Sequence, residues 1–301
     1  MAAMTTIAVK HRTQYRYSTP VEFGEHRFMF RPRDSHDLRL IETSLVLSPP
    51  ANVRWLHDVF GNSIATARFS TNAQELDVIS SFRAKHYPLP AQNILIEPYA
   101  ERYPFSYSAD EIADLGRTAE RHYQDPEHQI DLWARQFVDR DPERRSLQIL
   151  TAMMQAFHDR FSYSRREELG TQDPVRTLAS RSGSCRDYAL LMMEATRSLG
   201  FAARFVSGYL YDDQVVACRR TLVGGGETHA WVQIYLPGAG WVEFDPTNAL
   251  LGGKNLIRVA VARDPSQALP LSGSFTGPAN AFVGMTVSVE IMAEPDASEV
   301  I

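Results

Sequence analysis

The order of strand-like and helix-like segments constrains this sequence more than any other feature. Residues 5–88 form short runs in which apolar and polar side chains alternate, as in IAVKHRTQYRY, and turn residues separate these runs. Alternation with a period of two predicts half-buried strands, and several short strands with regular turns predict a β-sandwich. Residues 58–62 are expected to form a hairpin tip, because Gly61 and Asn62 tolerate positive φ angles.

Helical patterns dominate the middle of the chain. A Pro- and Tyr-rich connector (88–108) leads to expected helices at 108–123, at 128–139 and from residue 141 onward. A further helix is expected from Cys185 to Leu199, with an apolar stripe along one side and Gly200 as its stop signal.

Strand patterns return after this helix. We expect strands in ARFVSGYLY, THAWVQIYL, WVEFDP and MTVSVEIMA. The predicted fold class is therefore α+β. The predicted division is an N-terminal β-domain (1–88), a connector with helices (89–140), a catalytic core (141–292) and a flexible tail (293–301).

Composition and charge exclude several classes of protein. Apolar residues make up 44% of the 301 residues, and the formal net charge is −5, which argues against a nucleic-acid or membrane-surface partner. No run approaches the roughly 18 apolar residues of a membrane span, and the first residues lack the apolar stretch of a signal peptide. Two cysteines cannot build a disulfide framework. We therefore expect a cytoplasmic protein.

Cys185 lies where a helix is expected to begin. A nucleophilic cysteine must be ionised, and the unpaired amides and the dipole of a helix N-terminus favour negative charge there. The same amides could donate hydrogen bonds to a developing oxyanion. Gly183 and Ser184 are small and would let a substrate backbone come close. The alternative is that Cys185 is a buried packing residue, as isolated cysteines usually are; Cys218 is interpreted as incidental.

Among nine histidines, His229 has the most suggestive surroundings, because it lies in the otherwise apolar strand THAWVQIYL. A hairpin that turns near residues 237–240 would pair this strand with WVEFDP. If odd positions oppose odd positions, His229 and Asp245 share one face, directly opposite or one diagonal step apart; a register shifted by one residue would separate them. The predicted order is thus nucleophile, histidine, acid.

Three segments carry a resemblance to a known family. RSGSCRDYALLMMEATRSLGFAARFVSGYL, THAWVQIYL and GWVEFDPTN resemble the core motifs of the transglutaminase-like superfamily. HRFMFRPRD and HDVFGNSIA resemble the N-terminal β-domain of its bacterial members. The resemblance implies a papain-like core with the cysteine helix on an antiparallel sheet. It also implies Cys185 as nucleophile, His229 as general base and acid, and Asp245 as the orienting carboxylate.

One segment departs from the family pattern. The run ARDPSQALPLSGSF (262–275) has Pro265 where members of the family usually carry a tyrosine. Since this segment is expected to help shape the substrate cleft, the departure bears on substrate choice.

The sequence leaves three functions open. The first is thiol-dependent hydrolysis of a peptide or amide bond, with a peptide or protein as substrate. The second is transglutaminase activity, in which an amine takes the acyl group. The third is a non-catalytic binding or scaffold module. We expect no cofactor and no metal, because Cys185, Cys218 and His229 lack the spacing of a zinc site; the sequence leaves the oligomeric state open.

Overall fold

Strands dominate the N-terminal part of the protein. The computed structural model describes residues 4–87, 94–140, 142–166, 170–211 and 228–295. The hairpin tip predicted at residues 58–62 joins β4 to β5, and Gly61 has the expected positive φ of 72°. The N-terminal strands are β1 (Thr5–Phe23), β2 (His26–Phe28), β3 (Leu38–Ser48), β4 (Ala51–His57), β5 (Ser63–Phe69) and β6 (Ala73–His86).

These strands form two sheets that pack face to face. One sheet has the order β15-β1-β6-β3, and β16 (Phe282–Pro295) pairs with β1 as well; the other has the order β14-β2-β5-β4. The short strands β14 (Leu271–Ser272) and β15 (Phe275–Thr276) come from late in the chain. Val21 of β1 and Leu76 of β6 share a buried cluster with Phe28 of β2 from the other sheet. The predicted β-sandwich is therefore confirmed.

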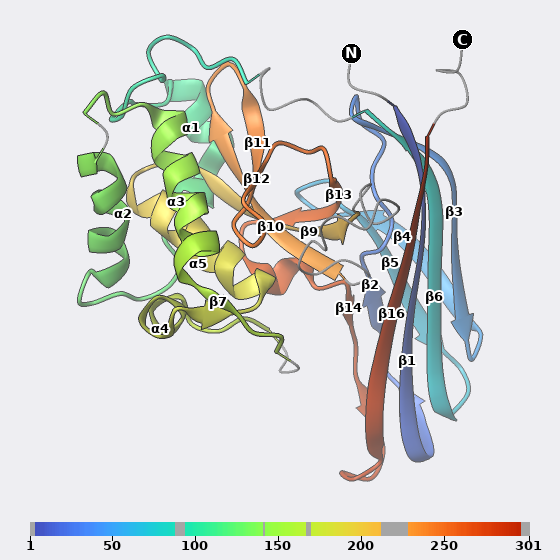
Figure 1. The fold of residues 1–301 in the computed structure, drawn as a ribbon. Coiled ribbons are helices and arrows are strands. Elements are labelled where there is room, and N and C mark those ends of the chain that lie inside the picture. Colours follow the sequence, from blue (N-terminus) through green and yellow to red (C-terminus); the bar gives the residue numbers. More distant parts are fainter. Residues whose placement is uncertain (1–3, 88–93, 141, 167–169, 212–227, 296–301) are drawn as a thin grey trace.

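The C-terminal strand returns to the first strand of the chain. β16 runs antiparallel to β1 from Tyr17 opposite Phe282 to Thr5 opposite Pro295, and Figure 1 shows the two strands side by side. The predicted division placed residues 141–292 in one core and began a tail at residue 293. Strand pairing corrects this limit, because β16 belongs to the sandwich as far as Pro295. The alternation in MTVSVEIMA predicts a strand, but the sheet that this strand joins depends on long-range pairing.

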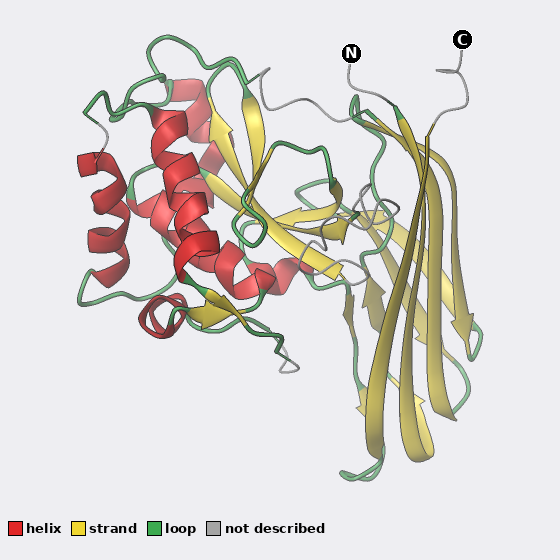
Figure 2. Cartoon of the chain, in the orientation of Figure 1, coloured by secondary structure: helices red, strands yellow, loops and turns green. Residues whose placement is uncertain are grey.

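The helices lie together on one side of the molecule (Figure 2). The helix expected at 108–123 is shorter, because Gly116, with a φ of 49°, ends α1 and a 3-10 turn follows. None of the helices in the described ranges is long and apolar enough to cross a membrane. The helical elements are α1 (Ala109–Leu115), η2 (Gly116–Ala119), α2 (Gln129–Arg140), α3 (Ser146–Arg160), α4 (Pro174–Ser180), α5 (Cys185–Ser198) and η4 (Pro265–Ala268).

Helix α4 did not emerge from the sequence. Asp173 caps it by accepting hydrogen bonds from the amides of Val175 and Arg176, and Pro174 occupies its first turn. An Asp-Pro pair at a helix start is a usable signal, although seven residues are too few to show an apolar period.

A third sheet, of five strands, forms the centre of the other half of the protein. Its order is β12-β11-β10-β9-β13, and its main strands run antiparallel. The even-numbered residues Ala230, Val232 and Ile234 of β10 pack in the same cluster as α5. The strands are β9 (Ala203–Leu210), β10 (Thr228–Leu236), β11 (Gly240–Asp245), β12 (Leu250–Leu251) and β13 (Leu256–Ala262).

The sequence predicts an apolar stripe along one side of helix α5, but in the structure nearly all sides of the helix are buried. Its polar residues Glu194 and Arg197 are buried as well, and Arg197 Nη1 lies 2.9 Å from Glu194 Oε1. Pairing of the two charges is what makes their burial tolerable. The α+β class and the helix-on-sheet core are thus confirmed.

The opposite face of this sheet packs on the β-sandwich. Tyr209 and Ile257 share a buried cluster with Ile7, Val9 and Phe82. The interface also holds polar contacts: the hydroxyl of Tyr209 lies 3.0 Å from Nδ1 of His11, which the sandwich contributes. Burial lowers the pKa of His11 to about 4, so the imidazole is neutral at physiological pH. The two halves therefore meet in a shared buried interface.

The hairpin tip between β4 and β5 makes a second polar contact across this interface. Asn62 donates to the carbonyl of Val261 at 2.7 Å and accepts from the amide of the same residue at 2.9 Å. Asp58 in turn holds the Asn62 amide group at 2.8 Å. This tip therefore joins the sandwich to the edge strand β13.

Candidate active site

Cys185 is the first residue of α5, directly after a tight loop. The two-residue strand β8 (Ser182–Gly183) pairs in parallel with β7 (Ser162–Tyr163), and Ser184 is the N-cap of the helix. Cys185 is 7% exposed and lies at the border of the largest hydrophobic cluster. Its position as the first residue of this helix is the one expected from the sequence.

Asp187 holds the loop that carries the cysteine. Its Oδ2 accepts from the amide and the hydroxyl of Ser184, both at 2.8 Å. Its Oδ1 accepts from the amide of Gln172 at 2.6 Å and from Nη1 of Arg166 at 2.8 Å. The carboxylate is completely buried. Asp187 therefore ties the first turn of α5 to two neighbouring loop segments.

The small residues before the cysteine serve packing rather than access. Gly183 is buried, and a Cβ on it would lie 2.9 Å from Cβ of Asp187. The hydroxyl of Ser184 is taken up by the same aspartate. The expectation that both residues leave room for a substrate backbone is thus corrected: Asp187 fills that space.

His229 and Asp245 meet on one face of the β10–β11 hairpin. Gln233 pairs with Glu243, so odd positions oppose odd positions, and His229 and Asp245 lie one diagonal step apart. Nε2 of His229 lies 2.8 Å from Oδ2 of Asp245, and both side chains are fully buried. The register on which the sequence prediction depended is therefore confirmed.

Residues just after β11 orient the Asp245 carboxylate. Oδ1 accepts from the amide of Thr247 at 2.9 Å, and Oδ2 accepts from the side-chain amide of Asn248, also at 2.9 Å. Burial by itself would raise the pKa of Asp245, but the charge and hydrogen bond of His229 and the two donors lower it below its ordinary value. The carboxylate is therefore ionised and held in place.

The imidazole of His229 is strongly basic in this setting. Burial would lower its pKa, but the charge and hydrogen bond of Asp245 and the interaction with Cys185 outweigh burial and raise the pKa to about 10. Nδ1, the ring nitrogen that Asp245 does not use, is buried and has no hydrogen-bond partner among the described residues. Nδ1 is thus available to exchange a proton with a group near Cys185.

Trp231 supports the histidine from within the sheet. Its indole ring stacks on the imidazole of His229 with centroids 6.0 Å apart, and its Nε1 donates to Glu243. Gly208 lies opposite His229, and a Cβ there would come within 2.6 Å of the Trp231 ring and 2.1 Å of the Ile257 carbonyl oxygen. Its odd-numbered position on β10 is the signal in the sequence that it shares the face of His229.

Tyr209 and Pro265 lie on other elements than this pair, on β9 and η4. Tyr209 is a core residue at the interface with the sandwich. Pro265 opens η4, and Asp264 caps it while accepting from the hydroxyl of Tyr123 at 3.0 Å. The influence of this segment on the substrate cleft stays a prediction. Cys218 lies outside the described residues.

A cysteine at a helix tip, with a buried histidine–aspartate pair on an adjacent antiparallel sheet, is the arrangement of papain-like thiol chemistry. Comparison with known families agrees with this class. Residues 133–246 match the model of the transglutaminase-like superfamily, and residues 7–85 match the bacterial transglutaminase-like N-terminal region. The chain belongs to the transglutaminase-like superfamily.

Individual relatives extend the likeness over nearly the whole chain. An uncharacterized protein of Mycobacterium tuberculosis is 27% identical over 289 residues, which cover 93% of this chain and 91% of that protein. A protein-glutamine gamma-glutamyltransferase of Pseudomonas aeruginosa is 34% identical over 102 residues, but these cover 33% of this chain and 15% of that protein.

A solved structure shares the complete fold. The crystal structure from Cytophaga hutchinsonii, described as a "putative cysteine protease", superposes with a TM-score of 0.73 and covers 97% of this chain and 91% of that one. Its sequence identity is 17%, so the likeness concerns the fold alone. Members of the superfamily are typically cysteine proteases or transglutaminases.

Proposed function

We propose that this protein is a thiol-dependent acyl-transfer enzyme that acts on a peptide or protein amide bond. Cys185 is the nucleophile, His229 the general acid and base, and Asp245 the carboxylate that orients and charges the histidine. The buried 2.8 Å contact between His229 Nε2 and Asp245 Oδ2 carries the proposal, because it leaves Nδ1 as the one ring nitrogen free for chemistry.

The raised basicity of His229 defines the resting state of the reaction. With a pKa of about 10, the imidazole is protonated at neutral pH, and the partner charge it favours is a thiolate on Cys185. The thiolate attacks the carbonyl carbon of the substrate, and the amide of Cys185 at the helix tip is placed to stabilise the oxyanion that forms. The proton on Nδ1 is then available for the leaving group.

Collapse of this intermediate breaks the carbon–nitrogen bond. The amine leaves with the proton from His229, and the acyl group remains on sulfur as a thioester. Water then attacks the thioester, gives a proton to His229 and releases a carboxylic acid as the carbon–sulfur bond breaks. We favour hydrolysis because it needs no dedicated site for a second substrate.

Transfer to an amine is the second candidate. The chemistry is identical up to the thioester, and an amine then takes the place of water. The relative from Pseudomonas aeruginosa, a protein-glutamine gamma-glutamyltransferase by name, favours this outcome. A non-catalytic scaffold is disfavoured, because neither packing nor partner recognition requires a buried histidine with an unused ring nitrogen. The cytoplasm remains the proposed location, and cell fractionation would test it.

Thiol labelling tests the proposed nucleophile. The rate of alkylation by iodoacetamide would be measured between pH 4 and 10 for the wild type, Cys185→Ala and His229→Ala. His158→Ala, which removes an exposed histidine of α3, is the matched control. A free thiol titrates near pH 8.5. If Cys185 is the nucleophile, we expect its rapid alkylation well below that pH. The fast phase should vanish in Cys185→Ala, slow in His229→Ala and persist in His158→Ala.

Product analysis separates the two candidate reactions. A glutamine-containing peptide would be incubated with and without a primary amine, and the products identified by mass spectrometry. A mass gain of about one unit indicates deamidation by water, whereas a covalent amine adduct indicates transfer. If Cys185 alkylates no faster than an ordinary thiol and His229→Ala changes nothing, the proposed function is wrong.

A further inference from the structure

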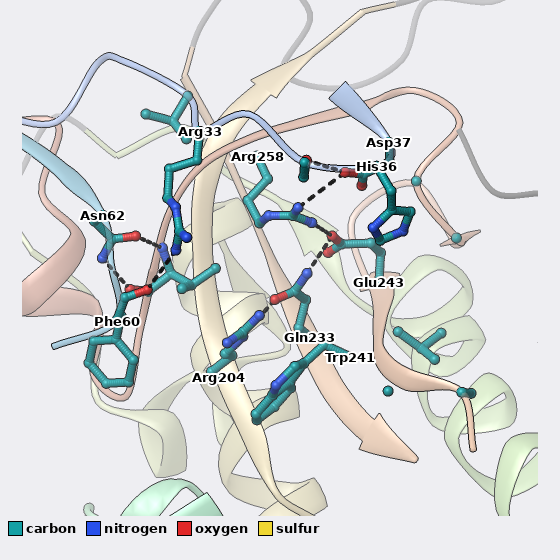
Figure 3. Close-up of a pocket in the computed structure, with 18 of the residues that line it drawn as sticks. Arg33, His36, Asp37, Phe60, Asn62, Arg204, Gln233, Trp241, Glu243 and Arg258 are labelled. Carbon is teal, nitrogen blue, oxygen red and sulfur yellow. Dashed lines mark hydrogen bonds and ion pairs between the residues drawn. The ribbon is translucent and has the colours of Figure 1, made fainter. Parts of the chain in front are cut away.

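A cavity of about 440 Å³ lies between the core sheet and the sandwich, away from the cysteine. Its floor comes from β9, β10, β11 and β13, and its rim comes from residues 33–37 and from the hairpin tip at residues 60–62 (Figure 3). Gln233 and Glu243 line it from the sheet face that also carries His229 and Asp245. None of the three proposed catalytic residues, all of them in the described part of the chain, lines the cavity.

A chain of polar groups runs across the cavity floor, and its central members Gln233 and Glu243 are buried. Arg258 contacts Glu243 Oε1 at 3.0 Å and Asp37 Oδ1 at 3.4 Å, so its charge is shared by two carboxylates. Gln233 donates through Nε2 to Glu243 at 2.6 Å and accepts through Oε1 from Nε of Arg204, also at 2.6 Å. Each contact fixes the next one, so Arg204 has a defined orientation.

Arg204 is left with unused hydrogen-bonding capacity. Its guanidinium stacks on the Trp241 ring, 4.1 Å from the ring centroid, and Nε bonds Gln233. Within the described ranges, neither Nη group of Arg204 has a hydrogen-bond or carboxylate partner. Burial lowers the pKa of Arg204 to about 9, although Glu243 opposes the effect and Arg258 and Arg33 add to it. A cation in this position is costly without a counter-ion.

Arg33 on the rim faces the same cavity with a neutral partner. Its Nη1 donates to the carbonyl oxygen of Phe60 at 3.3 Å, and no carboxylate of the described chain pairs with it. Figure 3 shows Arg33 and Arg204 among the side chains that line the pocket. Two guanidinium groups therefore border one cavity without an anionic partner from the described part of the protein.

We propose that this cavity binds the carboxylate of a small peptide. A guanidinium presents parallel N–H donors that match a carboxylate, and Arg204 is already held rigid by Gln233 and Trp241. The walls add apolar surface from Phe60, Ile94 and Val242, which suits an apolar residue next to the carboxylate.

The charges around the cavity favour a single negative charge on the ligand. Three arginines line it, and so do the three carboxylates of Asp34, Asp37 and Glu243. A dianion such as phosphate would therefore meet as much repulsion as attraction, whereas one carboxylate can bind between Arg204 and Arg33. The carboxylate can be the C-terminus of a peptide or the side chain of an acidic residue.

Calorimetric titration of the full chain with four probes tests the proposal. The probes are acetyl-Ala-Phe with a free carboxylate, the same peptide as its amide, acetyl-Glu-Phe amide and inorganic phosphate. We expect saturable binding of the free carboxylate and none of the first amide. Binding of the glutamyl amide as well would identify side-chain carboxylates as a source. Equal binding of acetyl-Ala-Phe and its amide, or binding of phosphate alone, overturns the proposal.

Variants connect the binding to the named arginines. Arg204→Met should weaken the free peptide about tenfold to a hundredfold, because it removes charged hydrogen bonds. Arg33→Met, on the exposed rim, should weaken it less and provides the test if Arg204→Met does not fold. Arg135→Met removes an exposed arginine of α2 and should leave the affinity unchanged. Undiminished binding in both Arg204→Met and Arg33→Met contradicts the proposal.

The peptide-carboxylate site does not depend on the proposed catalysis. Cys185→Ala should bind acetyl-Ala-Phe with wild-type affinity, because the cysteine is not among the residues that line the cavity. An inactive thiol with intact peptide binding would refute the proposed function and leave this site standing. A reactive Cys185 without peptide binding would refute this site and leave the proposed function standing.

Discussion

Asp245→Asn removes the charge that keeps His229 protonated while preserving the shape of the side chain. In the wild type, the pKa of His229 is raised from 6.5 to about 10 against the opposing effect of burial. At 1.36 kcal/mol per pKa unit, this difference corresponds to roughly 5 kcal/mol in favour of the charged ring. In the variant, burial and the interaction with Cys185 remain and the charge of Asp245 is gone, so we expect the pKa of His229 to fall toward its ordinary value.

The same change alters the dependence of stability on pH. Because the folded wild type holds a proton that the unfolded chain releases above pH 6.5, this contribution is complete below pH 6.5. It is lost as the pH rises to about 10. Asp245→Asn should lose stability less steeply over this window. The variant should also be less stable at neutral pH. Both oxygens of Asp245 accept hydrogen bonds, so the NH₂ group of an asparagine would face a buried donor, at a cost of about 1–3 kcal/mol.

Histidine-selective NMR measures the titration directly. The protein contains nine histidines, and the spectrum of His229→Gln identifies the His229 signal by its absence. His158→Gln, at an exposed position of α3, shows whether such a substitution disturbs the other signals. A wild-type midpoint near 6.5, or the same midpoint in Asp245→Asn, refutes the reasoning. Urea unfolding at pH 6, 7.5 and 9 provides the independent check on stability.

Three further substitutions test the framework around the site. Asp187→Asn should lower the free energy of unfolding by about 3–5 kcal/mol, because it breaks a buried charged network; wild-type urea unfolding would refute this role. Gly208→Ala should lower the melting temperature by several degrees or prevent folding, since its Cβ would overlap a backbone oxygen at 2.1 Å; an unchanged thermal transition would contradict that. Asn62→Ala should cost about 2–3 kcal/mol through its two hydrogen bonds to Val261, whereas Asn52→Ala at an exposed position should cost little. Equal chemical denaturation of the two asparagine variants would remove Asn62 as a link between the halves.

Much of the candidate site could be predicted from local sequence pattern. The start of α5 at Cys185 follows from a polar N-cap before a helical run. The common face of His229 and Asp245 follows from strand alternation and a short turn. Both inferences work because helix caps and hairpin register depend on residues close together in the chain. The family resemblance added the assignment of roles, which pattern alone could not supply.

The tertiary structure decided what depends on contacts between distant segments. Nothing local in MTVSVEIMA indicates that β16 joins β1 rather than the core sheet. The side chain of Asp187 fills the space beside Gly183, because Arg166 and the amide of Gln172 fix its carboxylate. The sequence determined the helix tip, the hairpin parity and the fold class through short-range periodicity. Only folding brought Arg33 and Arg204 to one cavity, because a pocket between two halves forms when their separately specified surfaces pack together.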